Sequence, residues 1–340
     1  MSRIAQPALL VSSAETGRLN VMHLKRFWLK SVLKRTGSMA ASIPGDEWQI
    51  DKILLSALGL GLEQTMTYVY NTNPSFETFE DWVINTAGFP PASKIDRFNR
   101  LITGGNVSNG PVPNVLTEKE LDFFEANGYL VVENVVPKTD CDKAIDVICN
   151  YIGIKRDDPE TWQSDHAARQ GIMVQLFQDN ILEKNRQSTR LRQVFEQLYN
   201  RTDLWVTTDR VGVNPPETGN WKFPGPHLHW DVSLQLPIPF KLQGLLYLAD
   251  TAENQGAFTL VPGFQHRIAG WLARLPAGAD PRSENLEALG SKPIAANAGD
   301  FIVWLQALPH GSRPNTAAKP RFVQYITYEP ADVNAAAIWK

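Results

Sequence analysis

The chain has 340 residues, of which 43% are hydrophobic and 20% are charged, and these proportions exclude a disordered chain or a fibrous repeat. This length predicts one large domain or two, with a core that needs no disulfide or metal ion to hold it together. The net charge of −3 argues against a nucleic-acid partner, because such binding depends on neutralising phosphates. The longest nearly apolar run, 53–62, is about half of the roughly 20 residues that a bilayer span needs, so we expect no membrane span.

The first 45 residues carry seven basic side chains against one acidic side chain, Glu15. A basic, serine-containing start is typical of an organelle transit peptide, and that interpretation stays open. The sequence favours instead a short tail followed by a helix over 23–34, whose apolar residues would pack inward. These residues are Leu24, Phe27, Trp28 and Val32.

Cys141 and Cys149 are the two cysteines of the chain, and both fall in a stretch with helical periodicity. Eight residues along a helix separate them too far for one to bridge the other. We therefore expect two reduced core residues in a reducing compartment, which favours a cytoplasmic location.

Residues 46–88 are predicted to be mostly helical, because apolar residues recur through them at helical spacing. A helix over 75–87 would begin at a serine N-cap and stop at Gly88. A Gly/Asn/Pro-rich stretch over 104–114 then predicts a linker. The helix over 75–87 has an aromatic stripe that is more typical of packing than of ligand recognition. The stripe consists of Phe76, Phe79 and Trp82.

A different pattern follows the linker. Thr117 and Glu120 form a capping box that begins a short helix ending near Gly128, and a strand is predicted over 129–136. A further helix carries apolar residues on one face over 191–198. Short strand-like runs then alternate with Pro/Gly turns, as is typical of a β-sandwich or barrel. These runs are 204–213, 227–236, 242–248, 257–261, 301–305 and 321–328.

His227, His229 and Asp231 lie in one of these runs at spacings of two residues. Because side chains alternate along a strand, all three would project from one face, with Trp230 on the other face in the core. A His and an Asp on one face can bind the same metal ion, and His310 is the best candidate for a third ligand. Two imidazoles and one carboxylate form the facial triad of non-haem Fe(II) oxygenases.

Arg321 follows His310 by eleven residues. If His310 ends one strand and Arg321 begins its neighbour, both side chains face one cavity. The guanidinium could then hold the far carboxylate of 2-oxoglutarate. Arg210 is a weaker candidate for the cavity wall, because an arginine in a strand is more often part of a structural ion pair. His227 is either a substrate-facing group or a histidine at the rim of the barrel.

Four segments in the last two thirds of the chain match the pattern of a known family. The segment Leu-Thr-Glu-Lys-Glu-Leu-Asp-Phe-Phe-Glu-Ala-Asn-Gly-Tyr-Leu-Val-Val is similar to the family's first helix and strand. The later matches are Ala-Asp-Thr-Ala-Glu-Asn-Gln-Gly leading to Val-Pro-Gly at 249–263, Ala-Gly-Asp-Phe at 298–301 and His-Gly-Ser at 310–312. Residues 116–330 thus resemble the phytanoyl-CoA dioxygenase family of Fe(II)/2-oxoglutarate-dependent oxygenases.

The resemblance implies a mainly β protein with flanking helices (α+β), built around a double-stranded β-helix, or jelly-roll, over 116–333. Residues 1–115 would form an additional helical region that has no counterpart in the family. Where the family has Pro-Gly-Ser-His, this chain has one residue more, over 262–266, so no role is assigned to His266.

The resemblance also implies site residues. It gives His229, Asp231 and His310 as iron ligands and Arg321 as the group that holds 2-oxoglutarate. Ser312 would support the same carboxylate, although a serine here could equally serve a turn. Arg210 is the weakest of the expected cofactor contacts.

The expected activity is that of an Fe(II)- and 2-oxoglutarate-dependent dioxygenase that uses O₂ to hydroxylate an unactivated C–H bond of a small molecule. Asp231 favours hydroxylation, since related halogenating enzymes replace this carboxylate with a small residue. One alternative is a catalytically silent β-helix binding protein, with 1–115 as a module for a protein partner, a carrier or a dimer contact. The other is a cupin-type metal enzyme, which would need a glutamate where Ser233 and Leu234 stand.

Overall fold

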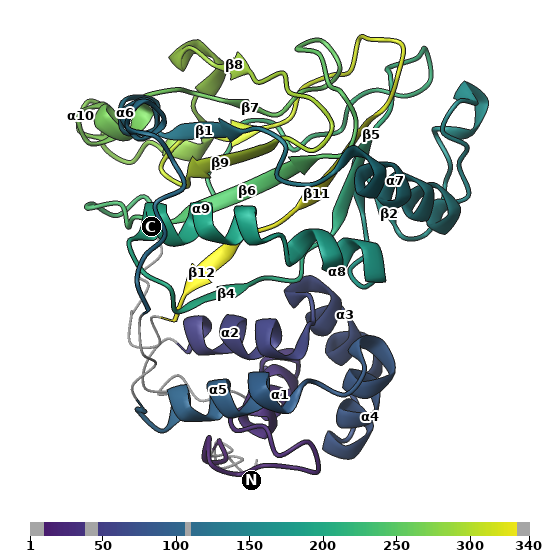
Figure 1. Cartoon of the computed structure of the whole chain (residues 1–340), viewed down its shortest axis with the longest axis vertical. Helices are drawn as coiled ribbons and strands as arrows, with labels where there is room; N and C mark the ends of the chain where they lie inside the picture. The colour runs from purple at the N-terminus through teal and green to yellow at the C-terminus, as the bar shows by residue number, and fades with distance from the viewer. Residues whose placement is uncertain (1–9, 38–46, 106–109, 332–340) are drawn as a thin grey trace, which may run out of the picture. The chain divides into compact units, whose positions relative to one another are not determined.

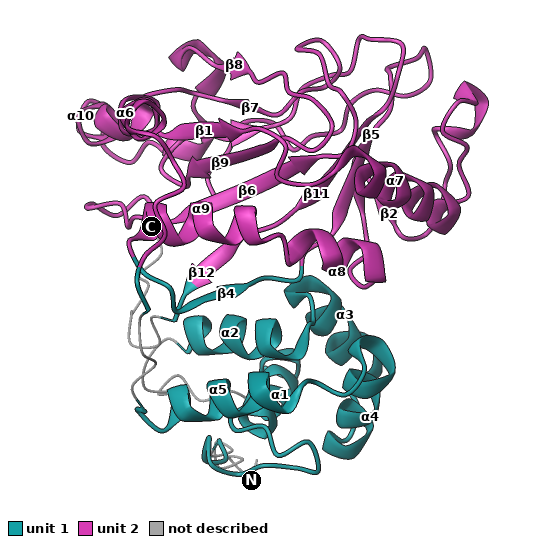
Figure 2. Ribbon diagram, viewed as in Figure 1, with its two compact units in different colours: residues 1–111, 201–208, 330–337 teal, residues 112–200, 209–329, 338–340 magenta. Residues whose placement is uncertain are grey.

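The structure is a computed structural model, and it describes residues 10–37, 47–105 and 110–331. The chain divides into two compact units (Figure 2). The first comprises residues 1–111, 201–208 and 330–337, and the second comprises residues 112–200, 209–329 and 338–340. The expected division at residue 115 differs from this one by a few residues, and nothing in the sequence indicates that 201–208 would join the first unit.

The first unit is mainly helical, as Figure 1 shows. Its elements are α1 (Leu24–Arg35), α2 (Trp48–Leu58), α3 (Leu62–Thr72), α4 (Phe76–Ala87), α5 (Ala92–Ile102) and the strand β4 (Leu204–Val206). The predicted helix over 23–34 and the helical stretch up to residue 88 are therefore confirmed for the described residues. Gly59 ends α2 with a positive φ of 69°, and Ser75 caps α4 by accepting a hydrogen bond from the Thr78 amide.

Helix α5 was not predicted. Only Ile95 and Phe98 among its side chains are buried, so its apolar pattern is short. Phe98 packs edge-on against Trp205 of β4, with ring centroids 6.4 Å apart, and the Arg97 guanidinium lies 4.1 Å from the Trp205 ring. A strand that is distant in sequence therefore completes the environment of this helix.

The aromatic stripe of α4 packs inside the first unit, as expected. Tyr68 and Trp82 stack with centroids 4.3 Å apart, and Phe79 is fully buried. Burial of large aromatic side chains in a closed cluster is a strong source of stability. The stripe therefore belongs to the hydrophobic core of this unit.

Part of the basic N-terminal sequence is neutralised inside the first unit. Lys30 Nζ lies 2.7 Å from Asp51 and 2.9 Å from Glu47, Arg26 lies 2.8 Å from Glu47, and His23 Nε2 lies 3.1 Å from Asp51. His23, Glu47 and Asp51 are close enough to hold a metal ion, but the Lys30 ammonium already lies against both carboxylates. This cluster is therefore a buried salt-bridge network that joins α1 to α2.

The second unit contains two antiparallel sheets. A seven-stranded sheet has the order β1-β9-β6-β11-β5-β3-β2, and a three-stranded sheet has the order β10-β7-β8. The strands of the larger sheet are β1 (Tyr129–Val132), β2 (Arg169–Gln170), β3 (Met173–Val174), β5 (Val211–Asn214), β6 (Leu242–Tyr247), β9 (Phe301–Leu305) and β11 (Arg321–Tyr325). Those of the smaller sheet are β7 (Thr259–Leu260), β8 (Lys292–Pro293) and β10 (His310–Gly311), and β12 (Tyr328–Pro330) follows β11.

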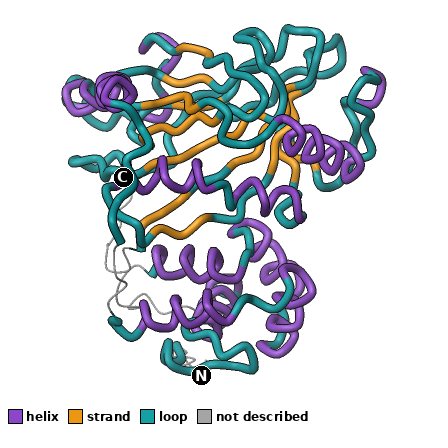
Figure 3. Tube along the Cα trace, viewed as in Figure 1, coloured by secondary structure: helices purple, strands orange, loops and turns teal. Residues whose placement is uncertain are grey.

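Helices pack on one face of the larger sheet, and the core lies on the other (Figure 3). Phe195 of α9 (Thr189–Tyr199) packs on Phe301 of β9 with centroids 5.9 Å apart, and Asn185 of α8 (Asn180–Arg186) bonds to Gln324 of β11. Residues that alternate with these point to the opposite face, where they meet the smaller sheet. The helices of the second unit are α6 (Glu118–Asn127), α7 (Lys138–Ile152), α8 (Asn180–Arg186), α9 (Thr189–Tyr199) and α10 (Ile268–Leu272), of which α10 contributes Ile268 to the core. Short 3₁₀ turns lie at Pro159–Thr161, Phe264–His266, Pro281–Ser283 and Leu286–Leu289.

Several sequence expectations for the second unit are confirmed. The Thr117 amide donates to the Glu120 carboxylate at 2.7 Å, and Thr117 Oγ1 accepts from the Glu120 amide, so the capping box is present. Cys141 and Cys149 are free and buried, and burial raises the pKa of the Cys141 thiol to about 12 and that of Cys149 to about 11.

Among the described residues, no helix is both long and apolar enough to cross a membrane.

Several strand predictions were wrong in extent or in kind. The run 257–261 forms a strand at Thr259–Leu260, and the run 321–328 divides between β11 and β12. The strand predicted over 129–136 stops at Val132, and the run 204–213 splits into β4 and β5. The run 227–236 is not a strand, since only His229 in it forms an isolated bridge, to His310. Prolines flank this run on both sides and lack the amide hydrogen that a continuing ladder needs.

Candidate functional site

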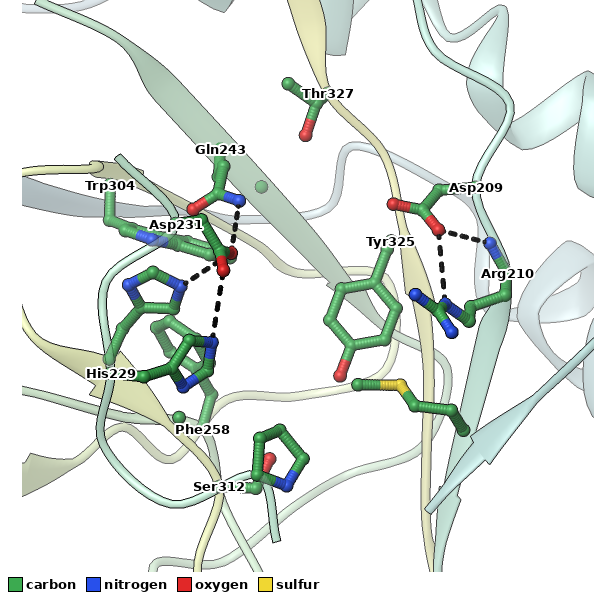
Figure 4. A pocket seen from close by; sticks show the side chains of 15 residues that line it. Asp209, Arg210, His229, Asp231, Gln243, Phe258, Trp304, Ser312, Tyr325 and Thr327 are labelled. Atoms are coloured by element: carbon green, nitrogen blue, oxygen red, sulfur yellow. Dashed lines mark hydrogen bonds and ion pairs between the residues drawn. The ribbon is translucent and has the colours of Figure 1, made fainter. Parts of the chain in front are cut away.

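A cavity of about 370 Å³ lies in the second unit, with walls from both sheets. Its wall contains polar, charged and aromatic groups (Figure 4). The larger sheet contributes Gln243, Gly244, Trp304 and Tyr325, the smaller sheet contributes His310 and Gly311, and loops contribute His229, Asp231, Ser312, Asp209 and Arg210 among others.

Backbone hydrogen bonds hold two histidines of the wall side by side. The His229 amide donates to the His310 carbonyl at 2.9 Å, and the His310 amide donates to the His229 carbonyl at 3.0 Å. The two imidazole rings consequently lie with centroids 4.8 Å apart. Residues 81 positions apart in sequence are thus fixed as neighbours by their backbones.

The ring nitrogens of both histidines are oriented by carbonyl groups. His229 Nδ1 lies 2.7 Å from the His227 carbonyl, and His310 Nδ1 lies 3.1 Å from the Leu308 carbonyl. Because a carbonyl only accepts, each Nδ1 carries the hydrogen, and each Nε2 is left with a lone pair when the ring is neutral. This arrangement is typical of metal-binding histidines, whose second nitrogen donates to a backbone or carboxylate oxygen.

Asp231 completes a group of three that could hold a metal ion. Its Oδ1 lies 3.4 Å from His229 Nε2, and its Oδ2 lies 3.3 Å from His310 Nε2. One ligand atom from each of the three residues falls within 4.8 Å of the others. Such a spacing, together with two imidazoles and one carboxylate, fits Fe(II) with positions open for further ligands.

The Asp231 carboxylate is held in its negatively charged form, which favours the binding of a cation. Burial alone would raise the pKa of Asp231, but hydrogen bonds from His229 and His310 outweigh it and leave the pKa below its usual range. Burial opposes charging of His229, but the hydrogen bond to Asp231 and its negative charge raise the pKa of this imidazole. An anionic carboxylate at this place would attract a metal ion.

Arg321 lies close to the cavity and is completely buried. Its Nη1 donates to the Gly256 carbonyl at 2.7 Å and to Ser312 Oγ, in the cavity wall, at 3.0 Å. Its Nε and Nη2 are buried and have no hydrogen-bond partner among the described residues. A buried guanidinium with two unused donors fits an anionic ligand, above all a carboxylate that accepts two parallel hydrogen bonds.

A family model for phytanoyl-CoA dioxygenase (PhyH) matches residues 124–323, which is more than half of the chain. The chain belongs to the phytanoyl-CoA dioxygenase family. Its general kind of function is therefore that of a dioxygenase.

The sequence identity to one named member of this family and to solved structures is low, between 15% and 26%. A Dictyostelium discoideum protein named as a phytanoyl-CoA dioxygenase is 26% identical over 262 residues, which cover 62% of this chain and 74% of that protein. The structure of the GlcNAc-inducible protein GIG2 from Candida albicans is 15% identical with a TM-score of 0.50, and the match covers 65% of this chain and 66% of that one. This second similarity concerns the fold alone. HygX from Streptomyces hygroscopicus, solved with nickel and 2-oxoglutarate bound, is 17% identical with a TM-score of 0.45, covering 66% of this chain and 97% of that one.

In this family member, the structure gathers most of the expected site residues. His229, Asp231, His310 and Ser312 share the cavity wall, with Arg321 directly behind Ser312. Their roles as ligands stay predictions. Arg210 lines the cavity, and its Nε lies 3.6 Å from Asp209 Oδ1. Its expected contact with the cofactor stays a prediction.

Other expectations about the site were wrong. His227 does not line the cavity with His229 and Asp231, and the run that contains them is not a strand. Its exposed ring packs edge-on against Phe223, with centroids 5.2 Å apart, and only its carbonyl supports the site. His310 and Arg321 do not lie on neighbouring strands, since β10 and β11 belong to different sheets. By contrast, no role was assigned to His266, and it lies outside the cavity wall, where its Nε2 is 2.8 Å from the Glu125 carbonyl.

The sequence analysis missed several residues of the wall. Gln243, Trp304 and Tyr325 come from the central strands of the larger sheet. One signal could have identified Gln243, because it is a polar residue in the otherwise apolar strand Leu-Gln-Gly-Leu-Leu-Tyr. Nothing comparable distinguishes Trp304, since aromatic residues are common in buried strands.

Gly311 lets the histidine pair form, and we expect its replacement to disrupt the site. A Cβ at this position would collide with the His227 carbonyl oxygen and lie 2.6 Å from the carbonyl carbon, and neither backbone atom can move aside cheaply. We predict that Gly311→Ala lowers the free energy of unfolding by about 1–3 kcal/mol, measured by urea denaturation. Gly219→Ala is the matched control, because a Cβ there meets no atom within 4 Å. Equal stability of the two variants would contradict the close approach.

Proposed function

We propose that this family member is an Fe(II)- and 2-oxoglutarate-dependent dioxygenase that hydroxylates an unactivated C–H bond of a small molecule. The observation that carries this proposal is the position of His229, Asp231 and His310 around one point of a cavity, with a buried, partly unpaired Arg321 close by.

His229, Asp231 and His310 would hold the iron. When bound, Fe(II) and 2-oxoglutarate supply oxidation of a C–H bond by O₂, with 2-oxoglutarate leaving as succinate and CO₂. The protein side chains provide the ligand set and its orientation. Carbonyl acceptors fix each imidazole with Nε2 toward the cavity, and the carboxylate of Asp231 faces both of these nitrogens.

Arg321 and Ser312 would hold the carboxylate of 2-oxoglutarate that is remote from the metal. The two unused guanidinium nitrogens offer donors for a paired, charge-assisted interaction, and Ser312 Oγ already accepts from Nη1. Burial of Arg321 excludes water, so this interaction would be stronger than at the surface. The same burial also fixes the side chain before any ligand arrives.

The fold supports this proposal. We infer that the seven-stranded and three-stranded antiparallel sheets form a double-stranded β-helix, with the metal group between them. His310 begins β10 in the smaller sheet, and Arg321 begins β11 in the larger one. A cofactor held at both ends would therefore bridge the two sheets.

The remainder of the cavity favours a polar substrate of modest size. At about 370 Å³, the cavity lies near the lower end of the usual range for small-molecule sites. Across from the metal group its wall carries the ion pair of Asp209 and Arg210, together with Tyr325 and Thr327 (Figure 4). Hydrogen-bonding groups at this end suit a substrate that carries polar substituents better than a plain hydrocarbon chain.

Succinate release tests the proposed activity. Purified protein with Fe(II) and 2-oxoglutarate is expected to release succinate slowly without added substrate and faster when a candidate substrate is present. Chelation of the metal should stop both reactions, and Ni(II) in place of Fe(II) should support neither. A catalytically silent binding protein would release no succinate under any of these conditions, and that result would contradict the proposal.

A further inference from the structure

Gln243 is the one side chain with an amide group on β6, the central strand between β9 and β11. Leu242 and Leu245, its neighbours on the strand, are fully buried. Gln243 itself reaches into the cavity, where its Nε2 donates a hydrogen bond to Asp231 Oδ2 at 2.8 Å (Figure 4). A polar residue at such a place in a sheet points to a specific role, because an apolar residue would fit the strand better.

Asp231 depends on support from outside its own segment. It lies in a stretch without regular secondary structure, and 45% of its side chain is exposed. Its carboxylate contacts three side chains in the described part of the chain: His229, His310 and Gln243. Both histidines are expected to turn their Nε2 lone pairs to a metal ion. Gln243 would then be the remaining side-chain donor to this carboxylate.

The orientation of the Gln243 amide follows from its surroundings. Its oxygen cannot face a carboxylate without repulsion, so Nε2 must point to Asp231. The oxygen then lies on the side of Trp304, as Figure 4 shows. Trp304 is the residue paired with Gln243 across β6 and β9. Gln243 Oε1 is an acceptor and Trp304 Nε1 is a donor, and both are buried without a hydrogen-bond partner among the described residues.

Trp304 links Gln243 to the other side of the metal group. Its ring packs against His310 with centroids 5.2 Å apart and against Phe258 with centroids 4.2 Å apart. The ligand carboxylate and a ligand imidazole are therefore supported by two residues that face each other on adjacent central strands. Strands of this kind are the most rigid elements available to hold a ligand.

We infer that Gln243 is a positioning residue, which holds the Asp231 carboxylate through Oδ2 so that it faces the two imidazoles. This inference rests on the proposed function, since it takes His229, Asp231 and His310 to be the metal ligands. Outer-shell partners of this kind orient a ligand and raise the affinity of the site, and their loss typically costs about 10- to 100-fold in metal affinity.

Metal binding by a shape-preserving variant tests the inference. Gln243→Met keeps the length of the side chain but has no donor, so we expect its dissociation constant for Co(II), measured by calorimetric titration of the metal-free protein, to rise about 10- to 100-fold. The absorption bands of bound Co(II) should also change, because the carboxylate loses its fixed orientation. The matched control is Gln170→Met on β2, the same substitution at an exposed position outside the cavity wall.

Thermal unfolding of the metal-free proteins separates positioning from a structural role. A residue that only stabilises the fold would lower the unfolding temperature of the Gln243→Met protein and leave its affinity for Co(II) unchanged, and this result would overturn the inference. Should Gln243→Met not fold, Gln243→Asn replaces it, because that amide is one methylene too short to reach Asp231. Co(II) affinity equal to wild type in the folded variant would likewise overturn the inference.

The outcome for the wild-type protein distinguishes this inference from the proposed function. If wild type binds Co(II) and Asp231→Ala does not, the metal site stands, and only the behaviour of the Gln243 variants decides the inference. If wild type binds no Co(II), the metal site itself is refuted, and the role of Gln243 is refuted with it.

Discussion

Replacing Asp231 with alanine is expected to abolish both metal binding and succinate release. The change removes the carboxylate that faces both imidazoles and leaves two histidines, which retain their backbone hydrogen bonds to each other. Loss of an outer-shell partner already costs up to about 100-fold in affinity, so loss of a ligand should lower turnover to less than about 1% of wild type. Calorimetric titration with Co(II) and a succinate assay with Fe(II) measure the two effects.

The matched control for this variant is Asp122→Ala. Asp122 is an exposed carboxylate on α6, outside the cavity wall, so its removal should leave both measurements unchanged. Removal of Asp231 should not unfold the protein, because its side chain is half exposed and its neighbours are held by their own backbones. Retained turnover in the Asp231→Ala protein would show that the reaction takes place elsewhere.

The elements of the site could be predicted to different degrees, and the reason is physical. The capping box at Thr117 and the N-cap at Ser75 depend on residues three positions apart, so they can be recognised directly in the sequence. His229, Asp231 and His310 were chosen by the chemistry of their side chains, and the structure does bring them together. The expectation that His229 and Asp231 lie on one face of a strand was nevertheless wrong, because no strand forms there.

That error came from treating alternation in sequence as proof of a strand. Residues 227–236 alternate as a strand would, but prolines flank them and only one residue pairs with β10. The proximity of His229 to His310 instead comes from a mutual pair of backbone hydrogen bonds and from the close approach that Gly311 allows. No local pattern encodes such a contact, since its two halves are far apart in sequence.

The remaining wall of the cavity was unpredictable for the same reason. Gln243 of β6 donates a hydrogen bond to Asp231, which lies in a loop. Trp304 lies beside Gln243 because β9 pairs with β6. Strand pairing must be known before these contacts can be inferred, and a single sequence does not give the order of strands in a sheet. The sequence does contain one signal of this wall, which is a glutamine within the largely apolar run that forms β6.

Replacing Arg321 with methionine is expected to raise the requirement for 2-oxoglutarate while leaving the metal site intact. Without the guanidinium, the far carboxylate of 2-oxoglutarate would be buried without a partner, at a cost of about 3 kcal/mol or more. This corresponds to a rise of about 150-fold in the KM for 2-oxoglutarate. The measurement is succinate release over a wide range of 2-oxoglutarate concentrations, with Co(II) binding recorded in parallel.

Stability of the protein without 2-oxoglutarate gives this prediction its sharpest test. Arg321 Nε and Nη2 have no partner among the described residues, so two of the three guanidinium nitrogens are buried without a hydrogen bond and the charge is satisfied through Nη1 alone. Arg321→Met should therefore leave the free energy of unfolding nearly unchanged or raise it. Arg186 is the matched control, because it is equally buried but, of its three guanidinium nitrogens, Nε alone lacks a partner among the described residues. Its Nη2 donates to the carbonyls of Phe177 and Asp209 at 2.7 and 2.9 Å, and its Nη1 lies 3.5 Å from the Glu183 carboxylate. Arg186→Met should therefore lose about 2 kcal/mol. If urea denaturation instead showed a large loss for Arg321→Met and KM were unchanged, Arg321 would be a structural residue, and 2-oxoglutarate would have to bind without it.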